Sequence, residues 1–110
     1  MTTVEVDGGI CGYVSAVRAR RSSPSTVHVD VESDCSMVMA CTESLNELQA
    51  RDALNPRREG WVHKLMFKHI RHAGCPVPTG VAKAVEVEMG AALPADAYIR
   101  FLEPEGKQLA

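Results

Sequence analysis

The stretch "TVHVDVE", residues 26–32, constrains the fold most strongly because it has the clearest period of two in the chain. Successive side chains of a β-strand point to opposite faces, so Val27, Val29 and Val31 are predicted to face a core. The polar residues between them are predicted to face solvent. A strand covered on one side in this way is typical of an antiparallel sheet, so the chain needs further strands beside it and helices against its apolar face.

Two earlier stretches supply candidate strands. Residues 2–6 alternate and end at a "DGG" turn, and residues 11–20 alternate again, with Cys11 at their start. The cluster "RSSPS" then provides turn residues before residues 26–32. The second and third strands are therefore predicted to form a hairpin.

The period changes after residue 33, where apolar residues recur at helical spacing and predict three helices. The first covers about 34–50, the second about 61–73 and the third 76–89, and Gly90 is placed to end the third. His69 falls near the centre of the second helix's apolar face, so it is predicted to be a structural histidine of the core.

The remaining segments complete the predicted architecture. Residues 51–60 contain Asn-Pro and a closing Gly and are predicted to be a loop or a broken helix end, residues 98–102 a last strand, and residues 105–110 a frayed tail. The chain of 110 residues has the size of one domain, residues 1–110. We therefore expect an α+β fold in which three helices cover one face of a three- to four-stranded, mainly antiparallel sheet.

Composition excludes several classes of function. The net charge of −2 and an aromatic fraction of 5% argue against nucleic-acid binding. No apolar stretch is long enough to span a membrane, and the polar start lacks the features of a secretion signal, so a cytoplasmic location is expected. In that reducing compartment the four cysteines are predicted to be free thiols, metal ligands or redox groups.

Three cysteines lie at the boundaries of predicted elements. Cys11 begins a strand, Cys35 lies in the first turn of the first helix, and Cys75 precedes the third helix, where it is the expected cap. The positive end of a helix dipole favours a thiolate, which is a better nucleophile and metal ligand than a thiol. Cys41 is different because it lies on the apolar stripe of the first helix, where it is predicted to be a small buried structural residue.

Two other residues are candidates to complete a metal site. His72 stands three residues before Cys75, and an imidazole beside thiolates is a common ligand set for zinc or iron. A surface role for His72 fits the sequence equally well. Asp34 is adjacent to Cys35 and is a candidate ligand, although capping the first helix explains it as well.

The order of these features resembles that of the iron-sulfur cluster scaffold proteins IscU and the N-terminal domain of NifU. The matching pieces are "CGYVSAV" with Cys11, "SDCSMVMA" with Cys35 and "HAGCPVPTGVAKAVEV" with Cys75. The resemblance implies an α+β fold on which the three cysteines converge to hold a cluster or a zinc ion. The "CPVP" segment followed by "KAVEVEMGAALPAD" is most similar to a small uncharacterised prokaryotic family.

Three functions follow as hypotheses. The first is a zinc or iron-sulfur binding module with Cys11, Cys35 and Cys75 as ligands and His72 or Asp34 completing the shell. It would work with a partner protein for cluster or sulfur transfer, and a homodimer is a further expectation. The second is a thiol enzyme or sulfur carrier with Cys75 as the reactive group. The third is a small interaction domain whose cysteines are incidental.

Overall fold

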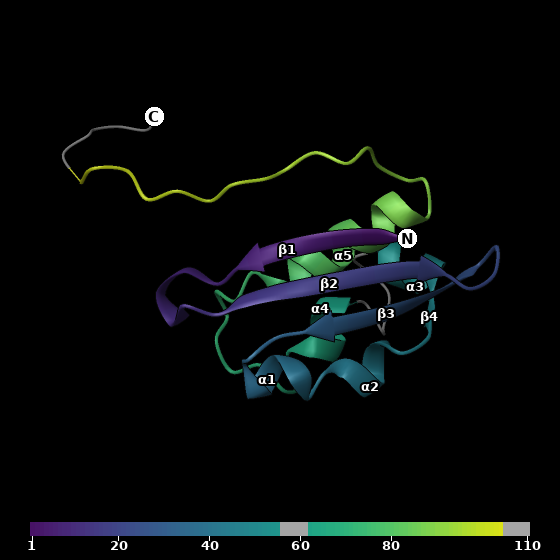
Figure 1. The fold of residues 1–110 in the computed structure, drawn as a ribbon, viewed down its shortest axis with the longest axis horizontal. Helices are drawn as coiled ribbons and strands as arrows, with labels where there is room; N and C mark the ends of the chain where they lie inside the picture. Colours follow the sequence, from purple (N-terminus) through teal and green to yellow (C-terminus); the bar gives the residue numbers. More distant parts are fainter. Residues whose placement is uncertain (56–61, 105–110) are drawn as a thin grey trace.

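A four-stranded antiparallel sheet organises the molecule in a computed structural model that describes residues 1–55 and 62–104. The strands lie in the order β1-β2-β3-β4, so each is hydrogen-bonded to its neighbour in sequence (Figure 1). They are β1 (Thr2–Asp7), β2 (Val14–Arg21), β3 (Thr26–Glu32) and β4 (Leu48–Gln49). The predicted hairpin of the second and third strands is confirmed.

The register of the strands separates a buried face from an exposed one. Val4 pairs with Val17, and Val17 pairs with Val31, so the three side chains lie on one face. The predicted inward positions on β3 are confirmed, because Val27, Val29 and Val31 are all buried. The opposite face is charged: the guanidinium of Arg18 lies 3.6 Å from the Asp30 carboxylate and 3.0 Å from that of Glu32.

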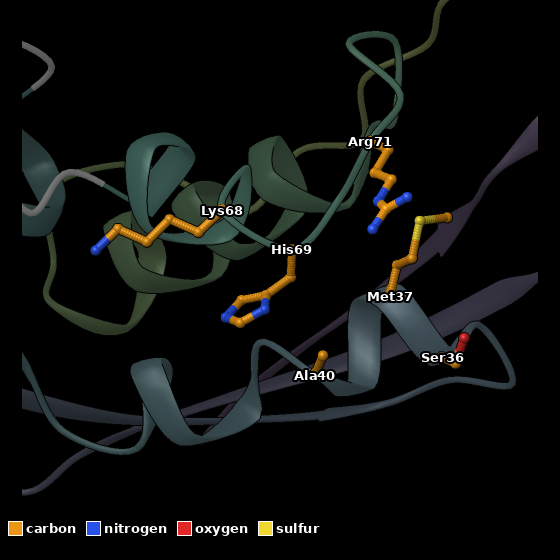
Figure 2. Close-up of a pocket in the computed structure, with 6 residues that line it drawn as sticks. All are labelled: Ser36, Met37, Ala40, Lys68, His69 and Arg71. Carbon is orange, nitrogen blue, oxygen red and sulfur yellow. The ribbon is translucent and has the colours of Figure 1, made fainter.

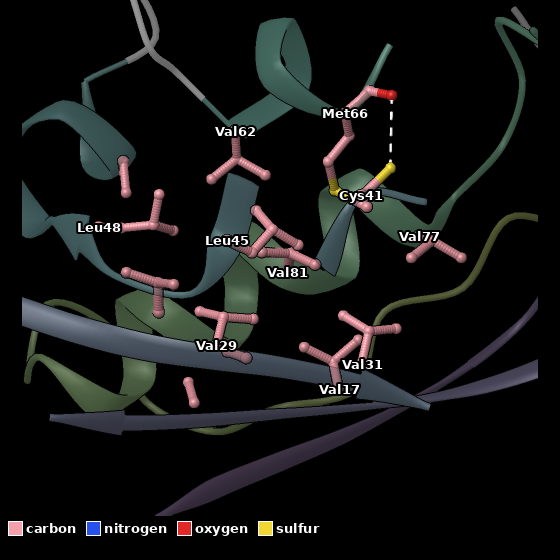
Figure 3. Packing of buried hydrophobic residues seen from close by; sticks show 14 of the residues in the cluster. Val17, Val29, Val31, Cys41, Leu45, Leu48, Val62, Met66, Val77 and Val81 are labelled. Carbon is pink, nitrogen blue, oxygen red and sulfur yellow. Dashed lines mark hydrogen bonds between the residues drawn. The ribbon is translucent and has the colours of Figure 1, made fainter. Parts of the chain in front are cut away.

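Helices cover the buried face, which confirms the predicted α+β class. The longest helix, α5 (Val77–Glu88), packs against β1 and β2, while α1 and α2 pack against β3 (Figure 1). The shorter elements are the 3-10 turn η1 (Gly9–Cys11), α1 (Ser36–Met39), α2 (Thr42–Leu45), α3 (Ala50–Leu54) and α4 (Val62–Met66). Buried side chains from both layers meet in one core (Figure 3).

One glycine lets α5 pack closely on the sheet, and another ends the helix. A Cβ on Gly80 would overlap the Val6 side chain, so the absence of a side chain lets α5 approach β1 closely. Gly90 has φ 79° and donates its N–H to the Val87 carbonyl, while the next residue donates to the Glu86 carbonyl. This pair of bonds is a Schellman motif, so the predicted end of the helix at Gly90 is confirmed.

The single helix predicted over 34–50 is wrong, because the segment folds as α1, α2 and β4. Thr42 donates its hydroxyl to the Met39 carbonyl, a local bond that competes with continuation of the helix. Leu48 then pairs with Val27, which makes this segment the fourth strand. The apolar stripe nevertheless marks core positions, since each of its members is buried: Val38, Cys41, Leu45 and Leu48.

The second predicted helix is shorter than expected. Its first residue lies outside the described residues, and regular helix ends at Met66, after which His69 and Ile70 both donate to the Met66 carbonyl. His69 consequently leaves the apolar face and is exposed rather than in the core. Of the segment 51–60, predicted to be a loop or a broken helix end, residues 51–54 belong to helix α3, which ends before Asn55, and residues 56–60 lie outside the described residues.

The prediction of a strand over 98–102 is also wrong. Residues 91–104 contain no helix or strand and are exposed throughout (Figure 1). The frayed tail predicted over 105–110 lies outside the described residues. Within the described ranges, no helix combines the length and apolarity needed to cross a membrane.

Candidate functional site

Three loops that carry cysteines lie at one end of the sheet. Strands β1 and β3 both run toward this end, so the loops that follow them meet there (Figure 1). Helix α5 begins at the same end, because its last residue, Glu88, contacts Thr2 and Arg21 at the opposite end. The structure thus gathers the segments of Cys11, Cys35 and Cys75 in the same region of the molecule.

The loop of Cys11 is a compact connection between β1 and β2. The Gly8 N–H donates to the Tyr13 carbonyl at 2.9 Å, and Gly9 and Gly12 both have positive φ values near 80°. Cys11 lies on η1 rather than at the start of a strand, and its side chain is exposed. A Cβ on Gly8 would overlap the Cys11 sulfur, so the thiol folds back over the loop.

Cys35 is held by two serines. Its N–H donates to the Ser33 hydroxyl oxygen at 3.1 Å, and the same oxygen accepts a bond of 2.8 Å from the Ser15 hydroxyl. Ser15 is the buried polar residue of β2, and this bond satisfies its hydroxyl group. Cys35 is the N-cap residue of α1, but its side chain makes no capping bond, which leaves the half-buried thiol available for other contacts.

Cys75 lies in the turn that leads into α5. Its N–H donates to the His72 carbonyl at 3.1 Å, and the N–H of Val77 donates to its sulfur. The N-cap position belongs to Pro76 and not to Cys75 as predicted, because the helix begins at Val77. Cys75 is half-buried against the core.

The four thiols interact electrostatically, and Cys75 is the one that interacts with all the others. Burial raises the pKa of the Cys75 thiol, the N–H of Val77 opposes this, and Cys35 and Cys11 raise the pKa further. Burial, followed by Cys75 and Cys35, raises the pKa of Cys41 to about 11. The thiolates of Cys35 and Cys11 therefore make Cys75 harder to ionise, and those of Cys75 and Cys35 do the same to Cys41.

Cys41 interacts with Cys75 and Cys35 but lies in the hydrophobic core. It is fully buried, and its thiol donates to the carbonyls of Met37 at 3.4 Å and Met66 at 3.6 Å (Figure 3). Its helical spacing predicts burial but gives no sign of its proximity to Cys35 and Cys75. That proximity depends on the break between α1 and α2, which the local pattern does not reveal.

The two other candidate ligands lie on the surface. His72 and Asp34 are both exposed, and they flank Cys75 and Cys35 in sequence. Across residues 1–55 and 62–104, no three or more His, Cys, Asp or Glu side chains are arranged to hold a metal ion. The thiols are thus neighbours that do not adopt coordination geometry in this conformation.

A shallow pocket of about 410 Å³ lies beside α1, directly after Cys35 in sequence (Figure 2). Arg71 and Met37 face each other across it, and His69 points toward Ala40. With Lys68, these residues make the rim basic. The sequence did not indicate this pocket, because His69 and Arg71 reach it only when α4 ends at Met66.

Comparison with known proteins identifies the family of the chain but gives no activity. Neither the curated proteins nor the solved structures give a significant match. The likeness to the iron-sulfur scaffolds consequently stays a prediction from the order of the cysteines. The model of a family of unknown function, DUF6951, matches residues 2–101, so the chain belongs to that family.

Proposed function

We propose that Cys11, Cys35 and Cys75 bind a thiophilic metal ion or an iron-sulfur cluster at this end of the sheet. One observation carries the proposal: the segments of Cys11, Cys35 and Cys75 lie at the same end of the sheet, and Cys11 and Cys35 both influence the pKa of Cys75. Three cysteines from separate segments are the donor set that zinc and iron-sulfur clusters use.

The electrostatics of the cluster favour a cation. Neighbouring thiolates, which raise the pKa of Cys75, are stabilised together with it when a divalent ion lies between them, and the ion displaces the thiol protons. The donor chemistry therefore fits zinc or a cluster, whereas the present arrangement of the side chains does not form a complete site. Binding would have to draw the thiols together. The thiol of Cys11 is exposed, whereas those of Cys35 and Cys75 are half-buried.

The thiol-enzyme hypothesis has weaker support. A catalytic thiol is activated when its pKa falls, and burial with two neighbouring thiols raises the pKa of Cys75 instead. The Val77 N–H acts in the opposite direction but is not the leading influence. The basic pocket beside α1 is the feature on which a substrate-binding version of this hypothesis would rest.

The proposal is tested by zinc competition against a chromophoric chelator, using reduced protein purified without oxygen. We expect one zinc ion per chain and a release of protons on binding. Replacement of Cys11, Cys35 or Cys75 by Ser is expected to weaken binding at least tenfold in each case. Cys41→Ala is the matched control, because it removes a buried thiol of the same cluster that is not assigned as a ligand.

Two results would count against the proposal. The first is less than a tenth of an equivalent of zinc or iron in protein that is folded by circular dichroism. The second is unchanged zinc affinity after replacement of Cys75, the thiol that interacts with all the others.

A further inference from the structure

The segment after α5, residues 91–104, is here named the C-terminal arm. It contains no helix or strand and extends clear of the body of the molecule (Figure 1). Ile99 is 88% exposed and Phe101 is 100% exposed. In all, the arm exposes five large apolar side chains: Leu93, Tyr98, Ile99, Phe101 and Leu102. A concentration of apolar surface of this kind marks an interaction site rather than an ordinary surface.

The arm already has the alternation of a β-strand. The guanidinium of Arg100 lies 5.4 Å from the centre of the Tyr98 ring, so these two side chains lie on the same side. In an extended chain the intervening residues point the other way, which places Ile99 and Phe101 together on the opposite side. The arm thus has one side with Ile99 and Phe101 and another on which Arg100 lies between Tyr98 and Leu102.

The sheet offers an edge that such a strand fits. Strand β1 is hydrogen-bonded to β2 on one side, and its other side is the edge of the sheet. On the core face of this edge, Val4 remains half-buried. Val87 of α5 is also half-buried, and it lies two turns after Gly80, the residue in contact with Val6. Ile99 and Phe101 would extend this apolar surface.

The charges of Glu5 and Arg100 favour the same orientation of the added strand. Glu5 lies on the solvent face of β1, is exposed, and forms no ion pair with any residue in the described part of the chain. A strand added with Ile99 and Phe101 toward the core face would present Arg100 on the solvent face, beside Glu5. Opposite charges on neighbouring strands stabilise a sheet, whereas like charges destabilise it.

From these observations we infer that the arm of one copy pairs with the β1 edge of a second copy, and the reverse, to form a reciprocal dimer. Ile99 and Phe101 are the side chains of the arm that face the core, and at about 150 Å² each they give about 300 Å² per arm and about 600 Å² for two arms. The surface that they cover on the partner roughly doubles this to about 1,200 Å², which is the lower end of the range for stable interfaces. The match to the family model also runs through the arm as far as residue 101.

Sedimentation equilibrium of the full chain at about 50 µM tests the inference, and we expect the mass of two chains. The double variant Ile99→Ser/Phe101→Ser is expected to raise the dimer dissociation constant at least tenfold. Leu93→Ser is the control, because Leu93 is equally exposed but lies outside the alternating segment. Circular dichroism checks that the variants fold, which is expected since all three positions are exposed.

A charge exchange identifies the two partners of the interface. Glu5→Arg alone and Arg100→Glu alone are each expected to weaken the dimer by creating like-charge pairs. Mixing the two single variants restores an opposite-charge pair at both contacts, so the mixture is expected to dimerise as wild type does. A monomeric wild type at 50 µM would overturn the inference, as would a dimer that survives the double variant or fails to respond to mixing.

Discussion

The two ends of helix α5 have opposite electrostatic character. At its last residue, Glu88 accepts hydrogen bonds from the Arg21 N–H at 2.9 Å and the Thr2 hydroxyl at 2.8 Å, and these bonds lower the pKa of its carboxyl group. Near its first residue, Cys75 lies among other thiols, and burial with these neighbours raises its pKa. Hydrogen-bond partners thus stabilise the negative charge of Glu88, whereas burial and the neighbouring thiols disfavour a negative charge on Cys75.

This difference separates a contact that stabilises the fold from a group of side chains that is a candidate binding site. A carboxylate at the negative end of a helix dipole is unfavourable, so the donors to Glu88 offset that repulsion and join α5 to the sheet. The thiol end has the favourable sign of dipole for thiolates, and a cation bound there would stabilise several of them together. The bonds of Glu88 therefore give its end of α5 a structural role, whereas the cysteine end is where we propose that metal binds.

The largest effect on stability is expected from a substitution that pushes α5 away from the sheet. Gly80→Ala places a Cβ against the Val6 side chain and is expected to lower the free energy of unfolding by about 1–3 kcal/mol. Because Gly80 lies between the two ends, the variant is also expected to weaken zinc binding. Urea denaturation and zinc competition measure the two effects.

Gly74→Ala serves as the control for that experiment. No atom lies within 4 Å of a Cβ at Gly74, so its replacement is expected to change the free energy of unfolding by about 0.5 kcal/mol at most. Equal effects of the two substitutions would contradict the close approach of α5 to β1.

A smaller effect is expected at the Glu88 end. Glu88→Gln is expected to lower the free energy of unfolding by about 1 kcal/mol at pH 7, because it removes the charge from two hydrogen bonds. The folded-state pKa of Glu88 is depressed, so its contribution is present above the ordinary value of 4.5 and is lost as the pH falls through the lowered pKa. Denaturation curves from pH 7 to pH 3 measure it.

The difference between Glu88→Gln and wild type should consequently disappear at low pH. Glu86→Gln is the matched control on the same helix, and it is expected to follow wild type throughout. A difference that stayed constant down to pH 3 would show that Glu88 does not act through its charge.

The smallest effect concerns the reactivity of the metal-free thiol. The pH midpoint for alkylation of Cys75 is expected to lie above that of a model thiol, because the pKa of Cys75 is raised. Cys35→Ser removes one neighbour and is expected to lower the midpoint. Mass spectrometry of alkylated peptides gives the value, and a midpoint below that of a model thiol would favour the thiol-enzyme hypothesis instead.

Local sequence patterns predicted the parts of the fold that local geometry determines. The alternation around Val29 gave the correct buried face, and Gly90 gave the end of α5, because each depends on nearby residues alone. Leu48 shows the limit of such patterns. It continues a helical stripe and is buried, but it is buried as part of β4, since pairing with Val27 replaced the helix.

The order of the cysteines along the elements was predictable, but their arrangement in space was not. The boundary positions of Cys11, Cys35 and Cys75 follow from the predicted elements, whereas the position of Cys41 beside them depends on how α1 and α2 separate. The C-terminal arm also shows that a local pattern does not determine which strand a segment pairs with. Its alternation is that of a strand, but within the described chain no strand pairs with it.

Titration of the metal-free, reduced protein with Co²⁺ tests whether the three cysteines bind metal together, because thiolate-to-cobalt absorption increases with the number of thiolate ligands. We expect saturation at one ion per chain with a thiolate signal that decreases in Cys11→Ser, Cys35→Ser and Cys75→Ser. Cys41→Ala is expected to retain the full signal. Absence of thiolate-to-cobalt absorption in the folded wild-type protein, or an equal signal in all four variants, would contradict the proposed metal binding.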